Sequence, residues 1–301
     1  MIDGIINIYK EKGYTSHDVV AKMRGILKIK KIGHTGTLDP DAVGVLPVCI
    51  GKATKLVDLI TDKDKTYDTV LKLGITTDTQ DMTGTILKTA PVNADFQKIS
   101  AVIESFQGEY LQLPPMYSAI KVGGKKLYEL ARQGKEIERE RRKVTIKAIR
   151  ILEYFPEKEE VALSVDCSKG TYIRTLLHDI GEELGCGGTM KSLVRTAVGN
   201  FLIDEALKLG QVEELVRTDS LKDTVIPVDQ MFMQYDRIIV EREFHRLIYN
   251  GNAFMAQHTL RPELEPSQEF VRVYDADHTF IGLYRWEQKE EIYKPVKMFL
   301  T

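Results

Sequence analysis

The sequence predicts an α+β fold, because strand-like and helix-like segments follow one another without the strict alternation of a doubly wound sheet. Residues 67–73 and 161–167 alternate in polarity with the period of a strand. Apolar residues over 19–27 recur at the spacing of an amphipathic helix. Near the C-terminus, residues 270–274 and 280–284 flank a polar turn and predict a hairpin. We therefore expect a mixed sheet flanked by helices, followed by a small β-rich module.

The N-terminal segment is predicted to carry a strand, a helix and a loop, in that order. Residues 5–8 are predicted to form a short strand, which Gly13 ends. Ser16 is the predicted N-cap of the helix that ends near Leu27. The chain then enters a glycine-flanked loop over 33–44.

The middle of the chain adds a polar turn, a second amphipathic helix and a basic insertion. Residues 76–84 are rich in turn-forming side chains, and the apolar spacing predicts a helix over 99–106. Residues 114–143 contain a Pro-Pro pair, a Gly-Gly pair and many cations, so we expect a mobile insertion outside the core. After the strand at 161–167, a helix is predicted to begin near Thr171.

The length of 301 residues predicts two domains. Pro227 and the polar run through Asp236 mark the expected boundary, which gives a large unit of residues 1–235 and a small unit of residues 236–301. With 43% hydrophobic and 29% charged residues, the composition is that of an ordinary globular protein rather than a disordered one.

Several classes of protein are disfavoured by what the sequence lacks. It has no apolar stretch of the roughly 20 residues that a membrane span needs, and no basic-then-apolar start, so we expect a cytoplasmic protein. Cys49, Cys167 and Cys186 form no C-x-x-C pair, which argues against a disulfide framework and a zinc knuckle. The six histidines form no close pair on one helix face, and we expect no metal. The glycine spacing over 44–52 does not fit a phosphate-binding loop.

The charge is distributed unevenly. The net charge is only −2, yet residues 121–150 hold eleven Lys or Arg against four Glu, and residues 10–31 hold seven against two acids. Such clusters are most often solvated helix surface. The alternative is a face that follows a phosphate backbone and binds less tightly as salt rises.

The most unusual segment is GHTGTLDP at residues 33–40. Its two glycines permit backbone geometry closed to other residues, and Pro40 biases Asp39 toward an extended conformation. The loop therefore presents the Asp39 carboxylate in a set direction. Loop aspartates more often close a turn or cap a helix than catalyse a reaction, so further residues must decide.

Two other positions bear on Asp39. Arg174 is expected about one turn into the helix that follows the strand at 161–167. If its guanidinium met Asp39, it would keep a buried carboxylate ionised against desolvation; the alternative is a surface ion pair of small value. Tyr67, at the head of its strand, is either a core aromatic or a ring that stacks on a base, and His34 has the same ambiguity.

Seven motifs occur together and in a fixed order, and they are 33–55 (GHTGTLDPDAVGVLPVCIGKATK), 65–67 (KTY), 77–79 (TDT), 115–119 (PMYSA) with Lys121, 124–128 (GKKLY), 167–176 (CSKGTYIRTL) and 193–196 (LVRT). In these motifs the chain resembles the tRNA pseudouridine synthase B (TruB) family, the enzymes that modify uridine 55 of the T loop. Several long motifs are a far more specific signal than one short pattern. The resemblance covers most of the chain and implies the mixed, mainly antiparallel sheet of the pseudouridine synthase fold.

Carried over residue by residue, the resemblance implies that Asp39 is the catalytic aspartate, that Arg174 is its ion-pair partner and that Tyr67 stacks on the target ring. It also implies substrate contacts by His34, Tyr172, Leu193 and, in a supporting role, Lys10. The family's Lys-Pro is Lys10-Glu11 here, which removes a ring that stiffens the turn, and we expect a slightly looser backbone without loss of activity.

The resemblance further implies a monomer that acts on the T arm of tRNA without a cofactor. Residues 114–143 match the family's thumb, which closes over the RNA, and residues 236–301 resemble a PUA-type RNA-binding module. RNA contacts are expected from Lys65, Lys121, Lys125, Lys126 and Arg132.

Pseudouridine formation requires that the target uridine leave its stack, so base flipping is expected. The residue types leave open whether Asp39 attacks C1′ of the ribose, attacks C6 of the ring, or removes a sugar proton. Two other functions also remain open: a non-catalytic tRNA-binding or chaperone protein, and a hydrolase that pairs Asp39 with Asp41. The combination of Asp39, Arg174 and Tyr67 argues against the first, and the intervening Pro40 argues against the second.

Overall fold

The computed structural model describes residues 2–264 and 266–300, and its largest element is a nine-stranded sheet with the order β1-β3-β12-β4-β11-β10-β7, to which β2 adds beside β3 and β13 beside β12. Its strands are β1 (Gly4–Lys10), β2 (Ile32–His34), β3 (Val43–Ile50), β4 (Lys65–Leu73), β7 (Gly108–Gln112), β10 (Arg142–Phe155), β11 (Glu160–Cys167), β12 (Gly188–Val198) and β13 (Phe201–Leu202). Within the described residues, β12 and β3 are the parallel pair of this sheet and its other pairings are antiparallel. The α+β prediction, with a mixed and mainly antiparallel sheet, is confirmed.

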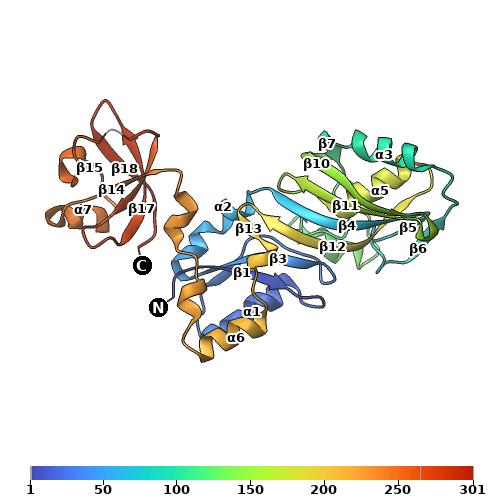
Figure 1. Ribbon diagram of the computed structural model, residues 1–301, viewed down its shortest axis with the longest axis horizontal. Helices are drawn as coiled ribbons and strands as arrows, with labels where there is room; N and C mark the ends of the chain where they lie inside the picture. Colours follow the sequence, from blue (N-terminus) through green and yellow to red (C-terminus); the bar gives the residue numbers. More distant parts are fainter. Residues whose placement is uncertain (1, 265, 301) are drawn as a thin grey trace.

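Helices cover the sheet in two groups (Figure 1). The group by the β1 end consists of α1 (Ser16–Leu27), α2 (Val57–Thr61) and α6 (Leu209–Arg217), and the group by the β10 end consists of α3 (Phe96–Ser105) and α5 (Ile173–Glu183). Two further helices lie outside these groups, α4 (Leu127–Ala131) in the basic insertion and α7 (His245–Tyr249) near the C-terminus. One apolar core joins α1 and α6 to β1 and β3, and another joins α3 and α5 to β4, β10 and β11. Short 3-10 helices occur at Gly51–Leu56, Pro156–Lys158, Ile203–Glu205, Leu221–Thr224, Val228–Phe232, Arg242–Phe244 and Ala256–His258.

The first helix begins differently from the prediction. Thr15, and not Ser16, is the N-cap: its hydroxyl accepts from the Asp18 amide at 3.1 Å, and the Asp18 carboxylate accepts from the Thr15 amide at 2.9 Å. This reciprocal capping box satisfies two free donors at once. Ser16 is thereby left to accept a hydrogen bond from the Leu38 amide at 3.0 Å, which ties α1 to the loop that carries Asp39.

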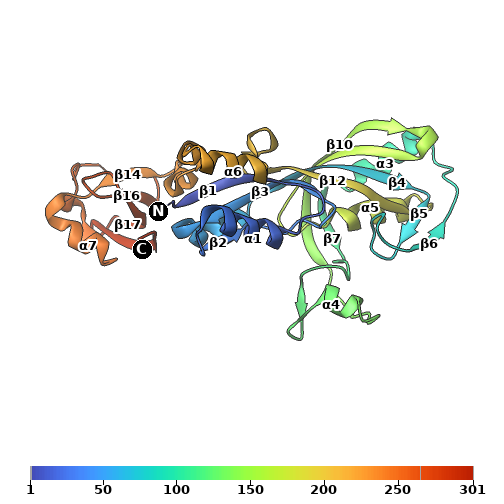
Figure 2. The same cartoon turned by 90° about the horizontal axis from the view of Figure 1, so that it is seen from below.

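The basic insertion leaves the body of the protein between β7 and β10. Figure 2 shows it projecting from the sheet, with α4 at its far end. It contains β8 (Lys121–Val122) and β9 (Lys125–Lys126), which pair with each other, and Leu127 and Leu130 of α4 are buried. The insertion ends at β10, so its predicted last residues belong to that strand.

The turn-rich stretch predicted over 76–84 lies largely within a hairpin of its own. β5 (Ile75–Thr77) pairs with β6 (Ile86–Thr89), and Asp81 in the connecting loop forms a bridge with Met190 of β12. The loop is thereby held over the central strands of the large sheet.

A second sheet of five strands has the order β14-β16-β17-β18-β15, and these strands are β14 (Asp236–Ile239), β15 (Phe254–Met255), β16 (Phe270–Tyr274), β17 (Phe280–Glu287) and β18 (Ile292–Met298). The predicted hairpin is present as the antiparallel pair β16 and β17. This unit lies beside the large sheet (Figure 1), with Leu283 and Phe299 packed in one cluster with Phe232. Among the described helices, none combines the length and the apolarity of a membrane span.

Candidate active site

Asp39 lies in the loop between β2 and β3, and backbone hydrogen bonds hold that loop in place. The Asp39 carbonyl accepts from the Ala42 amide at 3.1 Å, and the Pro40 carbonyl accepts from the Gly13 amide at 2.9 Å. Leu38 is buried, whereas the Asp39 side chain keeps 40% of its surface exposed. The buried Leu38 therefore anchors the loop, and the Asp39 carboxylate stays accessible.

Arg174, the second residue of α5, binds Asp39 in a two-point contact. Its Nε lies 3.1 Å from Oδ2, and its Nη2 donates to Oδ1 at 3.3 Å. The same guanidinium donates to the carbonyls of Tyr117 at 2.8 Å and Thr79 at 3.0 Å. A planar fork with several fixed acceptors has a single orientation, so Arg174 sets the direction of the carboxylate.

A second carboxylate, Asp81, lies on the other side of this guanidinium, with its Oδ2 3.6 Å from Arg174 Nη1. Its Oδ1 accepts from the Thr79 hydroxyl at 2.8 Å and the Thr83 amide at 3.0 Å. Asp81 was not predicted, because in the sequence it is one acid within a polar turn. The bridge between Asp81 and Met190 brings it to the site.

Opposing influences act on the Asp39 carboxyl. Burial raises its pKa above the ordinary value, the Arg174 charge lowers it, and the Asp81 charge raises it, with a net rise. Desolvation disfavours an isolated anion, whereas a guanidinium at bonding distance favours it. The geometry thus holds a carboxylate that is partly desolvated and more basic than an exposed aspartate.

Tyr67 lies on the central strand β4, directly opposite Arg195 of β12 in the sheet register. Its ring is buried, and burial raises the pKa of its hydroxyl against the opposing charge of Arg195. Arg195 is itself only 1% exposed, and its Nε donates to the Val45 carbonyl at 2.7 Å. Arg195 belongs to the motif at 193–196, but no role was predicted for it.

Tyr172 immediately precedes α5 and is held through its backbone. The side-chain amide of Gln112, 1% exposed at the end of β7, accepts from the Tyr172 amide at 2.7 Å and donates to its carbonyl at 3.0 Å. Tyr172 is the N-cap of α5 and has no capping hydrogen bond from its own side chain, and Gln112 satisfies its backbone amide. Leu193 is buried on β12 opposite Thr69 of β4. Gln112 was not predicted, because nothing in the sequence shows that β7 ends beside α5.

Lys10 and His34 flank the Asp39 loop. Lys10 is fully buried at the end of β1, where its amine donates to the Pro40 carbonyl at 3.0 Å and burial lowers its pKa to about 8. It therefore supports the loop from the protein side, whereas the prediction was a substrate contact. His34 Nδ1 accepts from the Gly36 amide at 3.4 Å, and its ring meets that of His17 at 5.2 Å. Burial lowers the pKa of His34, which favours the neutral ring.

The predicted RNA-binding side chains divide into two groups. Lys65 is 7% exposed, and its amine donates to the carbonyls of Thr61 at 2.5 Å and Lys63 at 2.6 Å. The Lys65 amine is therefore used inside the protein in this structure, and its predicted RNA contact stays a prediction. The others lie on the projecting insertion: Lys121, Lys125 and Arg132 are exposed, and Lys126 lies partly buried over the Tyr128 ring.

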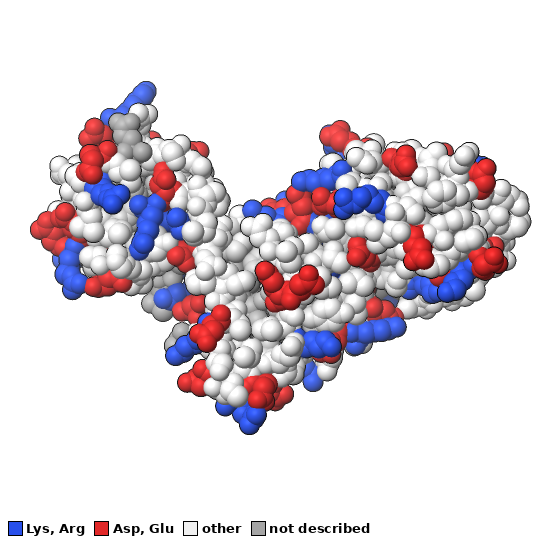
Figure 3. Space-filling model, viewed as in Figure 1, with Lys and Arg blue, Asp and Glu red and all other residues white. Residues whose placement is uncertain are grey.

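Charges of both signs are interspersed on the face shown in Figure 3. Among the described residues, His245, Asp275 and Asp277 come close enough to suggest a cation site. However, His245 Nε2 already accepts from the Ala276 amide at 3.0 Å, and Asp275 Oδ1 accepts from the amides of Asp277 and Thr279. Turn hydrogen bonds explain this cluster without a metal.

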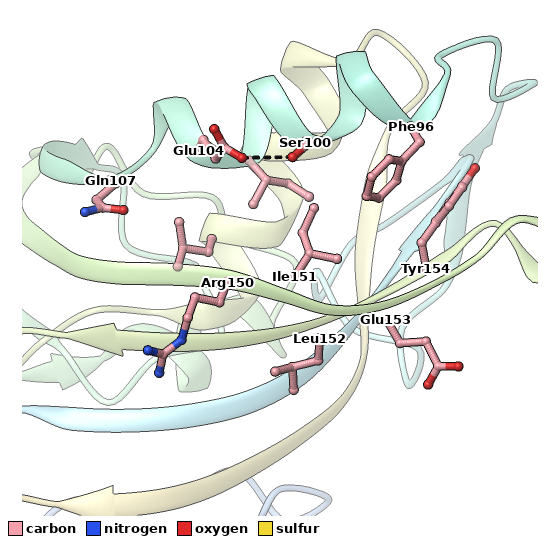
Figure 4. A pocket seen from close by; sticks show the side chains of 11 residues that line it. Phe96, Ser100, Glu104, Gln107, Arg150, Ile151, Leu152, Glu153 and Tyr154 are labelled. Carbon is pink, nitrogen blue, oxygen red and sulfur yellow. Dashed lines mark hydrogen bonds between the residues drawn. The ribbon is translucent and has the colours of Figure 1, made fainter.

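A cavity of about 1000 Å³ lies between α3 and β10. Figure 4 shows Phe96 beside Tyr154, and it shows the hydrogen bond from Ser100 to Glu104 on α3, at one side of the cavity. Neither Asp39 nor any side chain that contacts it lines this space. The candidate active site is therefore the open surface around Asp39 and not this cavity.

Comparisons with known proteins show the family to which the chain belongs. Residues 24–173 match the family described as TruB family pseudouridylate synthase (N terminal domain), and residues 174–233 match the tRNA pseudouridylate synthase B C-terminal domain. The chain is 53% identical over 307 residues to the tRNA pseudouridine synthase B of Lachnoclostridium phytofermentans, covering 99% of this chain and 100% of that protein. It is 39% identical over 306 residues to the protein of the same name from Bacillus subtilis, covering 100% and 98% of the two chains.

Solved structures with the same fold include chains of two multicomponent complexes. A chain in the "Structure of H/ACA RNP bound to a substrate RNA containing 2'-deoxyuridine" superposes with a TM-score of 0.71 at 23% identity, over 99% of this chain and 85% of that one. A chain in the "Crystal Structure of a Cbf5-Nop10-Gar1 Complex" gives a TM-score of 0.71 at 24% identity, with the same coverage. At this level of identity the likeness establishes the fold.

Proposed function

The chain belongs to the TruB family and is a tRNA pseudouridine synthase, and we propose that it isomerises the uridine at position 55 in the T loop, with Asp39 as its catalytic carboxylate. The observation that carries the proposal is the two-point contact of Arg174 with an accessible Asp39. This contact directs a desolvated carboxylate to the open surface of the protein, where a ribose can approach it.

The reaction is an isomerisation and needs no external electron acceptor. The bond between N1 of uracil and C1′ of ribose breaks, a bond between C5 and C1′ forms, and the proton on C5 is exchanged for one on N1. Asp39 acts in its ionised form, by attack on C1′, by attack on C6 or by removal of a sugar proton. All three routes place the carboxylate next to the ribose.

The detached base must be held while it turns. Tyr67 and Leu193 share an apolar cluster with Leu38, the neighbour of Asp39, and Tyr172 precedes the helix that carries Arg174. The buried position of Tyr67 on β4 gives its ring a fixed orientation. Extrusion of the uridine costs a few kcal/mol and is easiest in a loop whose stacking is already incomplete. A T-loop uridine meets that requirement better than one in a duplex.

Affinity for RNA is assigned to surfaces away from Asp39. The exposed cations of the projecting insertion, Lys121, Lys125 and Arg132, are suited to phosphates, and such contacts weaken with salt. We assign residues 1–235 to catalysis and the β-rich unit of residues 236–301 to RNA binding as a PUA-like domain. The separate core of that unit supports the division.

The proposal is tested with a tRNA transcript that carries no modifications. After incubation with the full-length protein, pseudouridines are mapped along the transcript by a chemical label that stops reverse transcription. We expect one strong signal at uridine 55, and no signal from a transcript in which that uridine is replaced by cytidine. A signal only at another position would overturn the assignment of the T loop, and no signal anywhere would favour a protein that binds tRNA without modifying it.

A further inference from the structure

We propose that Arg195 is a positioning residue that sets the distance between the Asp39 loop and the ring of Tyr67, and so the width of the space in which the target base turns. The inference rests on the proposed function and adds to it a residue that touches neither the base nor the ribose. Arg195 connects two elements that are far apart in the sequence and that carry the carboxylate and the aromatic ring.

The contacts of Arg195 reach both ends of the catalytic loop. Its Nε donates to the Val45 carbonyl at 2.7 Å, and its Nη2 to the Gly36 carbonyl at 3.4 Å. Asp39 lies between these two carbonyls in the chain. One planar group therefore fixes the loop before and after the carboxylate, so the loop cannot shift along β12 without breaking at least one bond.

The backbone of Arg195 is equally constrained. β12 runs parallel to β3 at this point, with Arg195 opposite Gly44. A Cβ on Gly44 would lie 2.2 Å from the Arg195 carbonyl oxygen, and Gly44 has a φ of 109°. Only glycine allows this close approach. Arg195 is thus held against the end of the loop by its main chain as well as by its side chain.

On its other side Arg195 faces Tyr67. The two residues are direct partners in the β4–β12 register, so their side chains emerge on the same face of the sheet. Leu193, two residues earlier on β12, emerges on that face as well. The three side chains form one rigid row, and the guanidinium at its end joins the row to the Asp39 loop.

The burial of Arg195 argues that this arrangement serves the site rather than the stability of the fold. The side chain is 1% exposed, and within residues 2–264 and 266–300 no carboxylate lies at ion-pair distance from it. Burying a cation without a counter-ion costs free energy that carbonyl contacts offset only in part. An apolar side chain would fill the same space at lower cost, but it would not bind the two loop carbonyls.

The test compares Arg195→Met, Arg195→Lys and a control, Lys191→Met. Lys191 lies on the same strand, and its amine binds Glu160 at 2.5 Å outside the site. For each full-length variant, kcat and KM are measured with a T-arm hairpin, together with RNA affinity and the melting temperature. We expect kcat of Arg195→Met to fall about 100-fold with unchanged affinity, because a misplacement of about 1 Å has that effect. Arg195→Lys should recover part of the rate, because it restores a cation at this position.

The outcomes separate this inference from the proposed function. Equal kcat values for Arg195→Met and Lys191→Met would overturn it, as would parallel losses of kcat and RNA affinity. If Arg195→Met does not fold, Arg195→Lys decides, because it keeps the charge: a reduced kcat with intact affinity supports the inference, and a wild-type kcat overturns it. A crystal structure of Arg195→Lys gives a readout independent of activity. The Asp39–Tyr67 separation should differ from that of the wild type, and an unchanged separation contradicts the inference even if the wild-type protein modifies another uridine.

Discussion

Arg174 contacts both carboxylate oxygens of Asp39, through Nε at 3.1 Å and Nη2 at 3.3 Å, although 135 positions separate the two residues in the chain. The loop between β2 and β3 supplies the carboxylate, and the first turn of α5 supplies the guanidinium. The Tyr117 carbonyl, which belongs to the projecting insertion, accepts from the same guanidinium. The Asp39–Arg174 pair is therefore joined directly to the segment proposed to hold the RNA.

Arg174→Lys should lower kcat by about 100-fold while leaving tRNA affinity nearly unchanged. Lysine keeps the charge, but its single ammonium cannot bind two carboxylate oxygens and two backbone carbonyls in one plane. Single-turnover rates at saturating tRNA measure the effect. Kinetics equal to those of the wild type would refute the orienting role of Arg174.

The rate should depend on pH on both sides of neutrality. Burial raises the pKa of Asp39, so the ionised form, and with it the rate, is lost as pH falls through that raised value. On the alkaline side Lys10, whose pKa burial lowers to about 8, loses the charge that it holds beside the Asp39 loop as pH rises. Lys10→Met should lower the rate about tenfold and remove the alkaline step, because an uncharged side chain has no proton to lose.

The alkaline step is measured from pre-steady-state rates of the wild type and of Lys10→Met, over the pH range in which both stay folded. Lys65 also has a pKa of about 8, but its amine binds the carbonyls of Thr61 and Lys63 rather than the loop. An alkaline step that persists in Lys10→Met would assign it to a group other than Lys10.

Gln112→Glu should make the hydrogen bonds that hold the Tyr172 backbone dependent on pH. The ionised carboxylate still accepts from the Tyr172 amide but repels its carbonyl, whereas the protonated form accepts and donates as glutamine does. The ratio of variant to wild-type rate should therefore rise as pH falls. Gln112→Met, which offers neither hydrogen bond, serves as the control with a ratio that does not change with pH. A constant ratio in both variants would show that Gln112 does not position Tyr172.

The parts of the site that local sequence governs were predictable. The glycine and proline residues around Asp39 indicated a loop that directs a carboxylate, and the alternation over 67–73 placed Tyr67 on a strand. The helix after residue 170 brought Arg174 to the position from which it contacts Asp39. In each case the signal lies within a few residues of the side chain, where backbone preferences act.

The remaining features depend on contacts between distant segments. Asp81 reaches Arg174 because its loop bridges to Met190, and Gln112 meets Tyr172 because β7 ends beside α5. Lys65 belongs to a family-like motif, but its position on the central strand buries it. No local pattern distinguishes a buried lysine from an exposed one, so the motif alone did not show that Lys65 is buried.

The β-rich unit should contribute to the binding of full-length tRNA and not to the binding of a T-arm hairpin. Arg237 and Arg261 flank a hollow of about 390 Å³ in this unit, and Arg237 lies over the Tyr274 ring at 4.4 Å. Changing both arginines to glutamine should raise KM for tRNA and reduce the salt dependence of binding, by about one unit of slope for each phosphate that the variant no longer binds. Equal effects on tRNA and hairpin would place the RNA-binding surface elsewhere.

The most direct measurement of the central claim is pseudouridine formation by Asp39→Asn on an unmodified tRNA transcript. Asparagine keeps the size and shape of the side chain but can neither attack carbon nor accept a sugar proton as an anion. We predict that the variant binds tRNA like the wild type and forms no pseudouridine at position 55. Measurable turnover by Asp39→Asn at that position would contradict the account.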